Sequence, residues 1–162
     1  MAKNKAAIDA ENDEAETRIP EQHEEVYLDT HRMINRALSG DLEKLEKGYA
    51  KVRLSTTEDM RADSVGLVHG GFIFSAADFA AMAAVNEPTV VLAGTDCLFL
   101  APVRVGDEVL FEAHVRHSEA RKRSVTVKGY SHDIKVFEGE FKTVVTEKHV
   151  LKLSLLHEVE NE

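Results

Sequence analysis

The chain has 162 residues, of which 43% are hydrophobic and 30% charged, a balance typical of one globular domain with a substantial core. Its formal net charge of -9 disfavours nucleic acid or an anionic membrane as a partner. The single cysteine, Cys97, excludes an intramolecular disulfide, and the polar N-terminus lacks the apolar core of a signal peptide. No apolar run is long enough to span a membrane, so the sequence predicts a cytoplasmic protein.

Residues 1–47 precede the region of regular hydrophobic patterning. Residues 1–25 hold eight acidic and three basic side chains and few apolar ones, so residues 1–24 are predicted to form a disordered acidic tail. Residues 25–47 are predicted to form a peripheral helical segment, because apolar side chains recur there at spacings of three and four: Ile34, Leu38, Leu42 and Leu45. This segment either packs against its own domain or binds a protein partner.

The remaining chain predicts one domain over residues 48–150 and a C-terminal tail over residues 151–162. Residues 48–54 alternate as a strand does, and residues 70–86 are almost all apolar or small, as in a helix buried on most sides. A long β-branched stretch then has the character of a central strand, and three further strands follow it: residues 89–103, 109–116, 124–130 and 134–146.

These elements predict an α+β fold in which one long helix is wrapped by an antiparallel sheet of five or six strands. One helix cannot cover such a sheet and also supply the second side of its own core. We therefore expect a homodimer whose sheets join edge to edge, which would remove exposed strand edges.

Asp78 is the one ionisable residue within the buried helix. Burial of an unpaired carboxylate costs free energy or raises the pKa of the group, so such a residue is seldom placed there without a task. Asp78 is therefore the first candidate for a catalytic residue. The alternative is a structural carboxylate that is satisfied by helix caps, by loop amides or by Asn86.

Three features together resemble the hotdog-fold acyl-CoA thioesterases of the PaaI-like branch. They are His69-Gly70-Gly71 at the start of a buried helix, Asp78 nine residues after the histidine, and Leu100-Ala-Pro-Val-Arg-Val-Gly-Asp107 after a long strand. The resemblance spans roughly residues 48–147. It implies a homodimer, or a tetramer, with active sites at the subunit interface that act on acyl-CoA. In that family the aspartate matching Asp78 is the nucleophile or general base, and an N–H at the helix start polarises the thioester carbonyl.

The positions of these residues along the helix fit that chemistry. Gly70 and Gly71 expose N–H groups at a helix N-terminus, where the dipole favours negative charge. Asp78 lies on the same helix face as Gly71 but roughly 10 Å further along, at 1.5 Å per residue. Two antiparallel helices across a two-fold axis would bring the two features together. His69 is expected to orient the site by hydrogen bonding rather than to act as a base.

Two observations favour a second function. Asp63 stands six residues before His69, where active relatives often carry an asparagine; a carboxylate can only accept hydrogen bonds and would repel an anion near Asp78. Residues 74–78, 123–127 and 137–141 also resemble the ligand-sensing hotdog domain of the malonyl-CoA-responsive repressor of fatty-acid synthesis, which binds acyl-CoA without hydrolysis. The alternative is therefore a non-catalytic acyl-CoA-binding regulatory protein that acts through a partner bound by residues 1–47.

The other candidates would bind the ligand. The one dense basic run is either a clamp for the CoA phosphates or a solvated hairpin turn: Arg121, Lys122 and Arg123. An apolar tunnel between subunits would hold the acyl chain, with Phe72, Phe79 and Met82 in its wall.

Asn86 lies two turns beyond Asp78 and either contacts the ligand or ends the helix. The histidines show no metal-ligand spacing with cysteine or carboxylates, so no metal is predicted. No cofactor is predicted either, because acyl-CoA would be the substrate or ligand.

Overall fold

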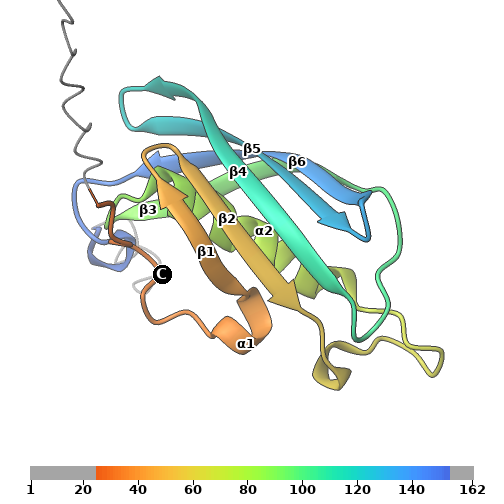
Figure 1. Cartoon of the computed structure of the whole chain (residues 1–162). Coiled ribbons are helices and arrows are strands. Elements are labelled where there is room, and N and C mark those ends of the chain that lie inside the picture. The colour runs from red at the N-terminus through yellow and green to blue at the C-terminus, as the bar shows by residue number, and fades with distance from the viewer. Residues whose placement is uncertain (1–24, 154–162) are drawn as a thin grey trace, which may run out of the picture.

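The computed structural model describes residues 25–153, in which a six-stranded antiparallel sheet curls around one long helix (Figure 1). The strands lie in the order β1-β2-β4-β5-β6-β3. This arrangement confirms the predicted hotdog fold. In chain order the elements are α1 (Arg36–Ser39), β1 (Asp41–Glu46), β2 (Tyr49–Ser55), the 3₁₀ helix η1 (Glu58–Met60), α2 (Gly70–Val85), β3 (Val90–Phe99), β4 (Glu108–Glu119), β5 (Lys122–Ser131), β6 (Ile134–Val145) and the 3₁₀ helix η2 (Val150–Lys152).

Helix α2 is the centre of the core. Nine of its 16 residues are buried, most of them alanines whose small side chains let the sheet approach closely. The helix ends at Asn86, which adopts the left-handed conformation (φ 52°, ψ 43°) and donates its N–H to the Met82 carbonyl at 2.8 Å. Pro88 follows and cannot extend the helix.

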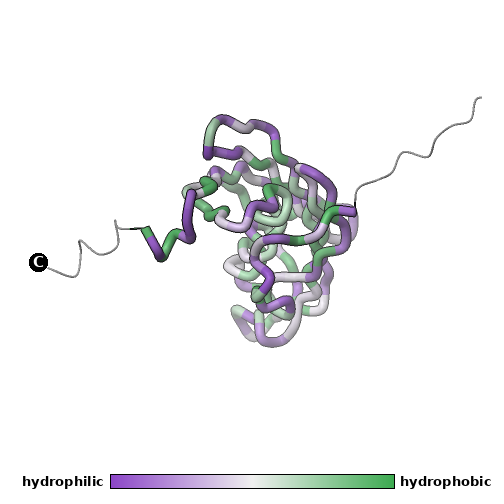
Figure 2. The backbone as a smooth tube through the Cα atoms, turned by 90° about the vertical axis from the view of Figure 1, so that its left-hand side faces the viewer, coloured by the Kyte–Doolittle hydropathy of each residue, from purple (hydrophilic) through white to green (hydrophobic). Residues whose placement is uncertain are grey.

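Alternate residues of the strands face α2 and form apolar rows across the sheet. One row runs from β2 to β3 through Val52, Phe111, Gly129, Phe137 and Phe99. Only glycine fits in the middle of this row, because a Cβ on Gly129 would lie 2.8 Å from Cε1 of Phe111. The neighbouring row faces away from α2 and carries charges instead, so hydrophobic and hydrophilic residues alternate along the backbone (Figure 2).

The prediction of a helical segment over residues 25–47 is wrong. The described part contains one four-residue helix, α1, followed by strand β1. A β-bulge between Leu42 and Lys44 shifts the register, so that Leu42 faces Val52 and Leu45 faces Ala50. Leu42 and Leu45 are three residues apart, yet they lie opposite two β2 residues that are only two apart. The bulge therefore gives a strand the three-residue spacing of apolar side chains that is typical of a helix.

The stretch predicted as a central strand, β3, lies at one edge of the sheet and pairs only with β6 within residues 25–153. Its side chains reflect this position: Leu98 is 58% exposed and Phe99 54% exposed. β1 forms the opposite edge, where it is short, bulged and charged, as guarded sheet edges are. The β3 edge also has a bulge, between Leu92 and Gly94, but it is longer, and Asp96 is its one charged residue. The predicted tails, residues 1–24 and 154–162, lie outside the described residues.

Candidate active site

The residues His69, Gly70 and Gly71 lie where a loop enters α2, and the fold holds this loop from two sides. The N–H of His69 donates to the Met60 carbonyl at 2.9 Å, and the N–H of Val68 donates to the Val103 carbonyl at 2.9 Å. These bonds fix the direction in which the helix starts.

The first amides of α2 are open to a ligand. Within the described part of the chain, no acceptor receives the N–H of Gly70 or of Gly71. His69 precedes the helix as its cap residue, and its side chain makes no capping hydrogen bond. Unpaired N–H groups at the start of a helix favour an oxyanion or a carbonyl that gains negative charge.

Asp78 is mostly buried in the middle of α2, and its Oδ1 atom has no hydrogen-bond partner among the described residues. Burial raises the pKa of this carboxyl from 3.8 to about 6. A carboxylate with a raised pKa and a free lone pair is a better proton acceptor at neutral pH than an ordinary aspartate.

Neither Gly71 nor His69 is close to Asp78 within one chain. At 1.5 Å per residue, the helix separates Gly71 from Asp78 by roughly 10 Å along its axis and His69 from Asp78 by more. The exposed His69 ring instead lies against the helix start: its Nε2 would be 3.1 Å from a Cβ on Gly71, and its centroid is 6.1 Å from that of Phe72.

Asp63 organises the loop that precedes the helix. Its Oδ1 accepts the N–H groups of Val65, Gly66 and Leu67 at 3.0, 2.9 and 3.1 Å. The bonds from Leu67 and Gly66 are the main causes that hold the pKa of the Asp63 carboxyl below its usual range. Its role in this structure is to shape the loop.

Asn86 is also used by the fold. Its side-chain oxygen accepts the N–H of Asp29 at 2.7 Å, and its Nδ2 donates to the Tyr27 carbonyl at 2.8 Å. Both halves of the amide therefore tie the N-terminal segment to the end of α2. These bonds support the alternative interpretation of Asn86 as the helix end, and ligand binding by Asn86 stays a prediction.

The three apolar candidates for the acyl-chain tunnel differ in how deeply they are buried. Phe79 and Met82 are 2% and 0% exposed, inside the core of the chain. They support the helix from within and present no surface to a ligand in this structure. Phe72 is only partly buried and lies beside His69 at the helix start.

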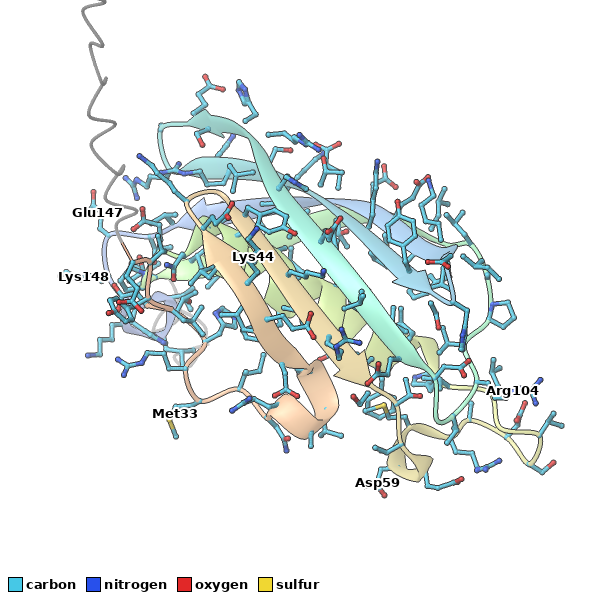
Figure 3. All side chains as sticks on the ribbon, in the orientation of Figure 1. Met33, Lys44, Asp59, Arg104, Glu147 and Lys148 are labelled. Carbon is cyan, nitrogen blue, oxygen red and sulfur yellow. The ribbon has the colours of Figure 1, made fainter. Side chains whose placement is uncertain are left out.

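The basic run lies at the other end of the molecule, in the turn between β4 and β5. The backbone carbonyl of Arg121 accepts the N–H of Val145, and the Arg121 guanidinium pairs with Glu147 at 3.3 Å. Arg123 Nη1 donates to two carbonyls of its own turn. Figure 3 shows Glu147 on the side of the molecule opposite Arg104, whose backbone pairs with Leu67 in the loop before α2.

A crevice of about 370 Å³ adjoins this turn. It is lined by both charged and small residues, among them Lys122, Arg123, Lys142 and Gly94. Three cations in one crevice suit an anionic group such as a phosphate, although Glu119 and Glu140 also reach it.

Comparison with known proteins decides the family. Residues 65–138, from the loop before α2 to the middle of β6, match the thioesterase superfamily model. The structure also superimposes on an uncharacterised protein, PH1136, from Pyrococcus horikoshii with a TM-score of 0.77 and 46% identity, over 78% of this chain and 98% of that one.

The chain belongs to the thioesterase superfamily of hotdog-fold proteins.

The chain is also similar to proteins that carry different names. The PaaI protein of the E. coli phenylacetic acid degradation operon is 26% identical, with a TM-score of 0.65, over 70% of this chain and 84% of that one. The transcription factor FapR of Caldanaerobacter subterraneus is 29% identical over 140 residues, 86% of this chain and 70% of that protein. A methylthioribose-1-phosphate isomerase of Aquifex aeolicus is 56% identical over 115 residues. That match covers 71% of this chain, and the chain spans only a quarter of the Aquifex protein.

Among residues 25–153, no three His, Cys, Asp or Glu side chains come together as ligands for a metal ion. No helix in that part of the chain is both long and apolar enough to cross a membrane.

One residue near the site was missed in the sequence. Phe99 ends β3 and places its Cε1 atom 3.5 Å from the position of a Cβ on Gly70. The alternation of β3 could have suggested that Phe99 faces the helix. That Phe99 lies next to Gly70 depends on how β3 crosses α2, and no local sequence pattern encodes this crossing.

Proposed function

We propose that this hotdog protein binds acyl-CoA thioesters and hydrolyses them with Asp78. The observation that carries the proposal is the mostly buried carboxylate of Asp78, with a free Oδ1 and a pKa of about 6, on a helix whose first amides have no acceptor among the described residues. A base and an oxyanion site are the two elements that thioester hydrolysis needs.

In this mechanism Asp78 accepts a proton from water as the water oxygen attacks the thioester carbon. The N–H groups of Gly70 and Gly71 stabilise the oxyanion that forms. When the carbon–sulfur bond breaks, the proton held by Asp78 passes to the leaving thiolate, which gives the free acid and CoA. Direct attack by the Asp78 carboxylate is the other route, with water then cleaving the acyl anhydride.

The site needs two subunits in this proposal. The two elements lie roughly 10 Å apart on one helix, a distance that one reacting thioester carbonyl does not span. A homodimer joined along the β3 edge would set two α2 helices side by side and antiparallel. The turn at Arg121 to Arg123, which lies near the end of α2, would then approach the Gly70 end of the second copy, where it can bind the phosphates of CoA.

A second function, acyl-CoA binding without turnover, is favoured by one specific observation. The likeness to the transcription factor FapR extends over 86% of this chain. In this alternative the protein acts through a partner. Residues 25–47 are poor candidates for the contact, because Leu38, Leu42 and Leu45 already pack against the core of their own domain. The cytoplasmic location expected from the sequence stays a prediction.

The test is the release of free thiol from short, long and aromatic acyl-CoAs by wild-type protein and by Asp78→Ala. Turnover by wild type that falls at least 100-fold in the variant would support hydrolysis by Asp78. Equal turnover in both proteins would refute the assigned role. Binding measured by thermal shift in the same samples, with no thiol released from any substrate, would favour the alternative.

A further inference from the structure

Phe99 lies where an acyl group would meet the helix start. Three atoms of its ring, Cε1, Cδ1 and Cζ, lie 3.5, 3.7 and 4.0 Å from the position of a Cβ on Gly70. The ring therefore borders the space directly beside the Gly70 backbone, and an atom placed there would be in van der Waals contact with it. Gly70 leaves this space open, because it has no side chain to fill it.

Phe99 is held firmly on one side and is open on the other. Its ring packs edge-to-face on Phe137, with centroids 5.3 Å apart and an angle of 76° between the planes. Phe137 is fully buried and packs in turn against Phe111 and Phe141. Phe99 itself remains 54% exposed. Because the ring packs on a close-packed core, its side chain has little freedom to move away from a ligand that contacts its exposed face.

We propose that Phe99 is the specificity-determining residue of this site and selects acyl groups by their bulk at the carbon next to the carbonyl. This inference rests on the proposed function, because it assumes that the Gly70 and Gly71 amides hold the acyl carbonyl.

The physical reason is the short distance between the amide and the ring. A carbonyl oxygen bonded to an N–H of the helix start lies about 3 Å from that nitrogen. The substituents on the neighbouring carbon are then beside Gly70, in the space that the Phe99 ring limits. A linear acyl chain can pass along the face of the ring, whereas a branched carbon at that position meets the ring.

Leu98 provides a matched control. It precedes Phe99 on β3, is 58% exposed, and pairs with Glu138 in a row that faces away from α2. Both side chains lie on the edge proposed for dimerisation, so any effect of truncation on the dimer is shared. Only Phe99 faces Gly70.

The experiment measures dissociation constants by calorimetry for two non-hydrolysable ketone analogues of acyl-CoA, in which CH₂ replaces the thioester sulfur. One carries a linear propanoyl group and the other a branched pivaloyl group. Wild type should prefer the linear analogue. Phe99→Ala should reduce this preference about tenfold, a usual effect of pocket size, and Phe99→Trp should increase it. Leu98→Ala should leave the ratio unchanged.

An unchanged ratio in both Phe99 variants, or an equal change in Leu98→Ala, would overturn the assignment. Failure of wild type to bind either analogue would overturn the acyl-CoA site itself and this assignment with it. Binding by wild type without hydrolysis of true acyl-CoAs would refute only the catalytic proposal and leave the selection by Phe99 standing. Phe99→Trp keeps an aromatic ring on the same support, so the test does not depend on Phe99→Ala alone being well folded.

Discussion

At the scale of single residues, Asp78 is ionised at neutral pH in surroundings that disfavour its charge. A rise in pKa from 3.8 to about 6 corresponds to roughly 3 kcal/mol of lost stability for the ionised form. Because the folded state holds its proton more tightly than the unfolded state, the wild-type free energy of unfolding should fall as pH rises from about 4 to about 6 and then level off.

Asp78→Asn should remove this dependence. We expect the variant to match wild type near pH 4 and to exceed it by up to roughly 3 kcal/mol above pH 7. Urea unfolding at several pH values measures the difference, with Asp96→Asn on the exposed strand β3 as the control. A difference that stays constant with pH would show that the carboxyl has an ordinary pKa.

The same pKa sets the pH dependence proposed for the reaction. If ionised Asp78 is the base, kcat/KM should rise with pH through an apparent pKa of about 6 and reach a plateau above it, because kcat/KM reports the pKa of the free enzyme. Measurement of kcat/KM between pH 4.5 and 8, at substrate concentrations well below KM, tests this expectation. A rate that is flat across pH 6 would assign the chemistry to another group.

At Asp63 the hydrogen-bond acceptor and the negative charge can be tested separately. Asp63→Asn keeps a side-chain oxygen that can accept the N–H groups of Val65, Gly66 and Leu67, whereas Asp63→Ala removes all three bonds. In this exposed loop we expect alanine to lower the midpoint of thermal unfolding and asparagine to lower it less. Thermal unfolding of the two variants distinguishes them; equal losses would mean that the charge, rather than the acceptor, holds the loop.

At the scale of elements, the end of α2 and the N-terminal segment depend on one side chain. Asn86 has a positive φ and bonds the backbone at Tyr27 and Asp29. Asn86→Gly should lose only the two bonds, about 1–2 kcal/mol, and Asn86→Ala should lose about 1 kcal/mol more, because the left-handed conformation strains a side chain. Hydrogen exchange at the Asp29 amide should accelerate in both variants, and a protected amide would contradict the tether.

The elements also show why a local pattern can mislead. The leucines at 42 and 45 have the spacing of a helix, yet a bulge places both against β2. Bulges follow from pairing with a neighbouring strand, so the sequence of the segment alone does not reveal them. The helix over residues 70–86, in contrast, could be predicted within one residue, because its composition, its glycines and Pro88 all act locally.

At the scale of the whole molecule, the two sheet edges predict where a second copy binds. Both edge strands carry a bulge, but β1 is short and rich in charged residues, whereas β3 is longer and carries one charge. Thr95→Glu, near the middle of β3, should convert a dimer of 18.0 kDa chains into monomers by placing like charges across the proposed two-fold axis. Lys44→Glu on the β1 edge should not. Light scattering after gel filtration measures both masses, and a dimer that survives Thr95→Glu would exclude this interface.

The sequence by itself determined the class of fold, the buried helix and the candidates Asp78, Gly70 and Gly71, because burial, helix start and charge are read from neighbouring residues. Only the tertiary structure decided which candidate residues lie close together in space. It assigned Asn86 and Asp63 to backbone hydrogen bonds and placed Phe79 and Met82 inside the core. It also separated the basic turn from the helix start and brought Phe99 beside Gly70. These relations join residues far apart in the chain, and they depend on strand order and register, which arise only when the whole sheet packs on α2.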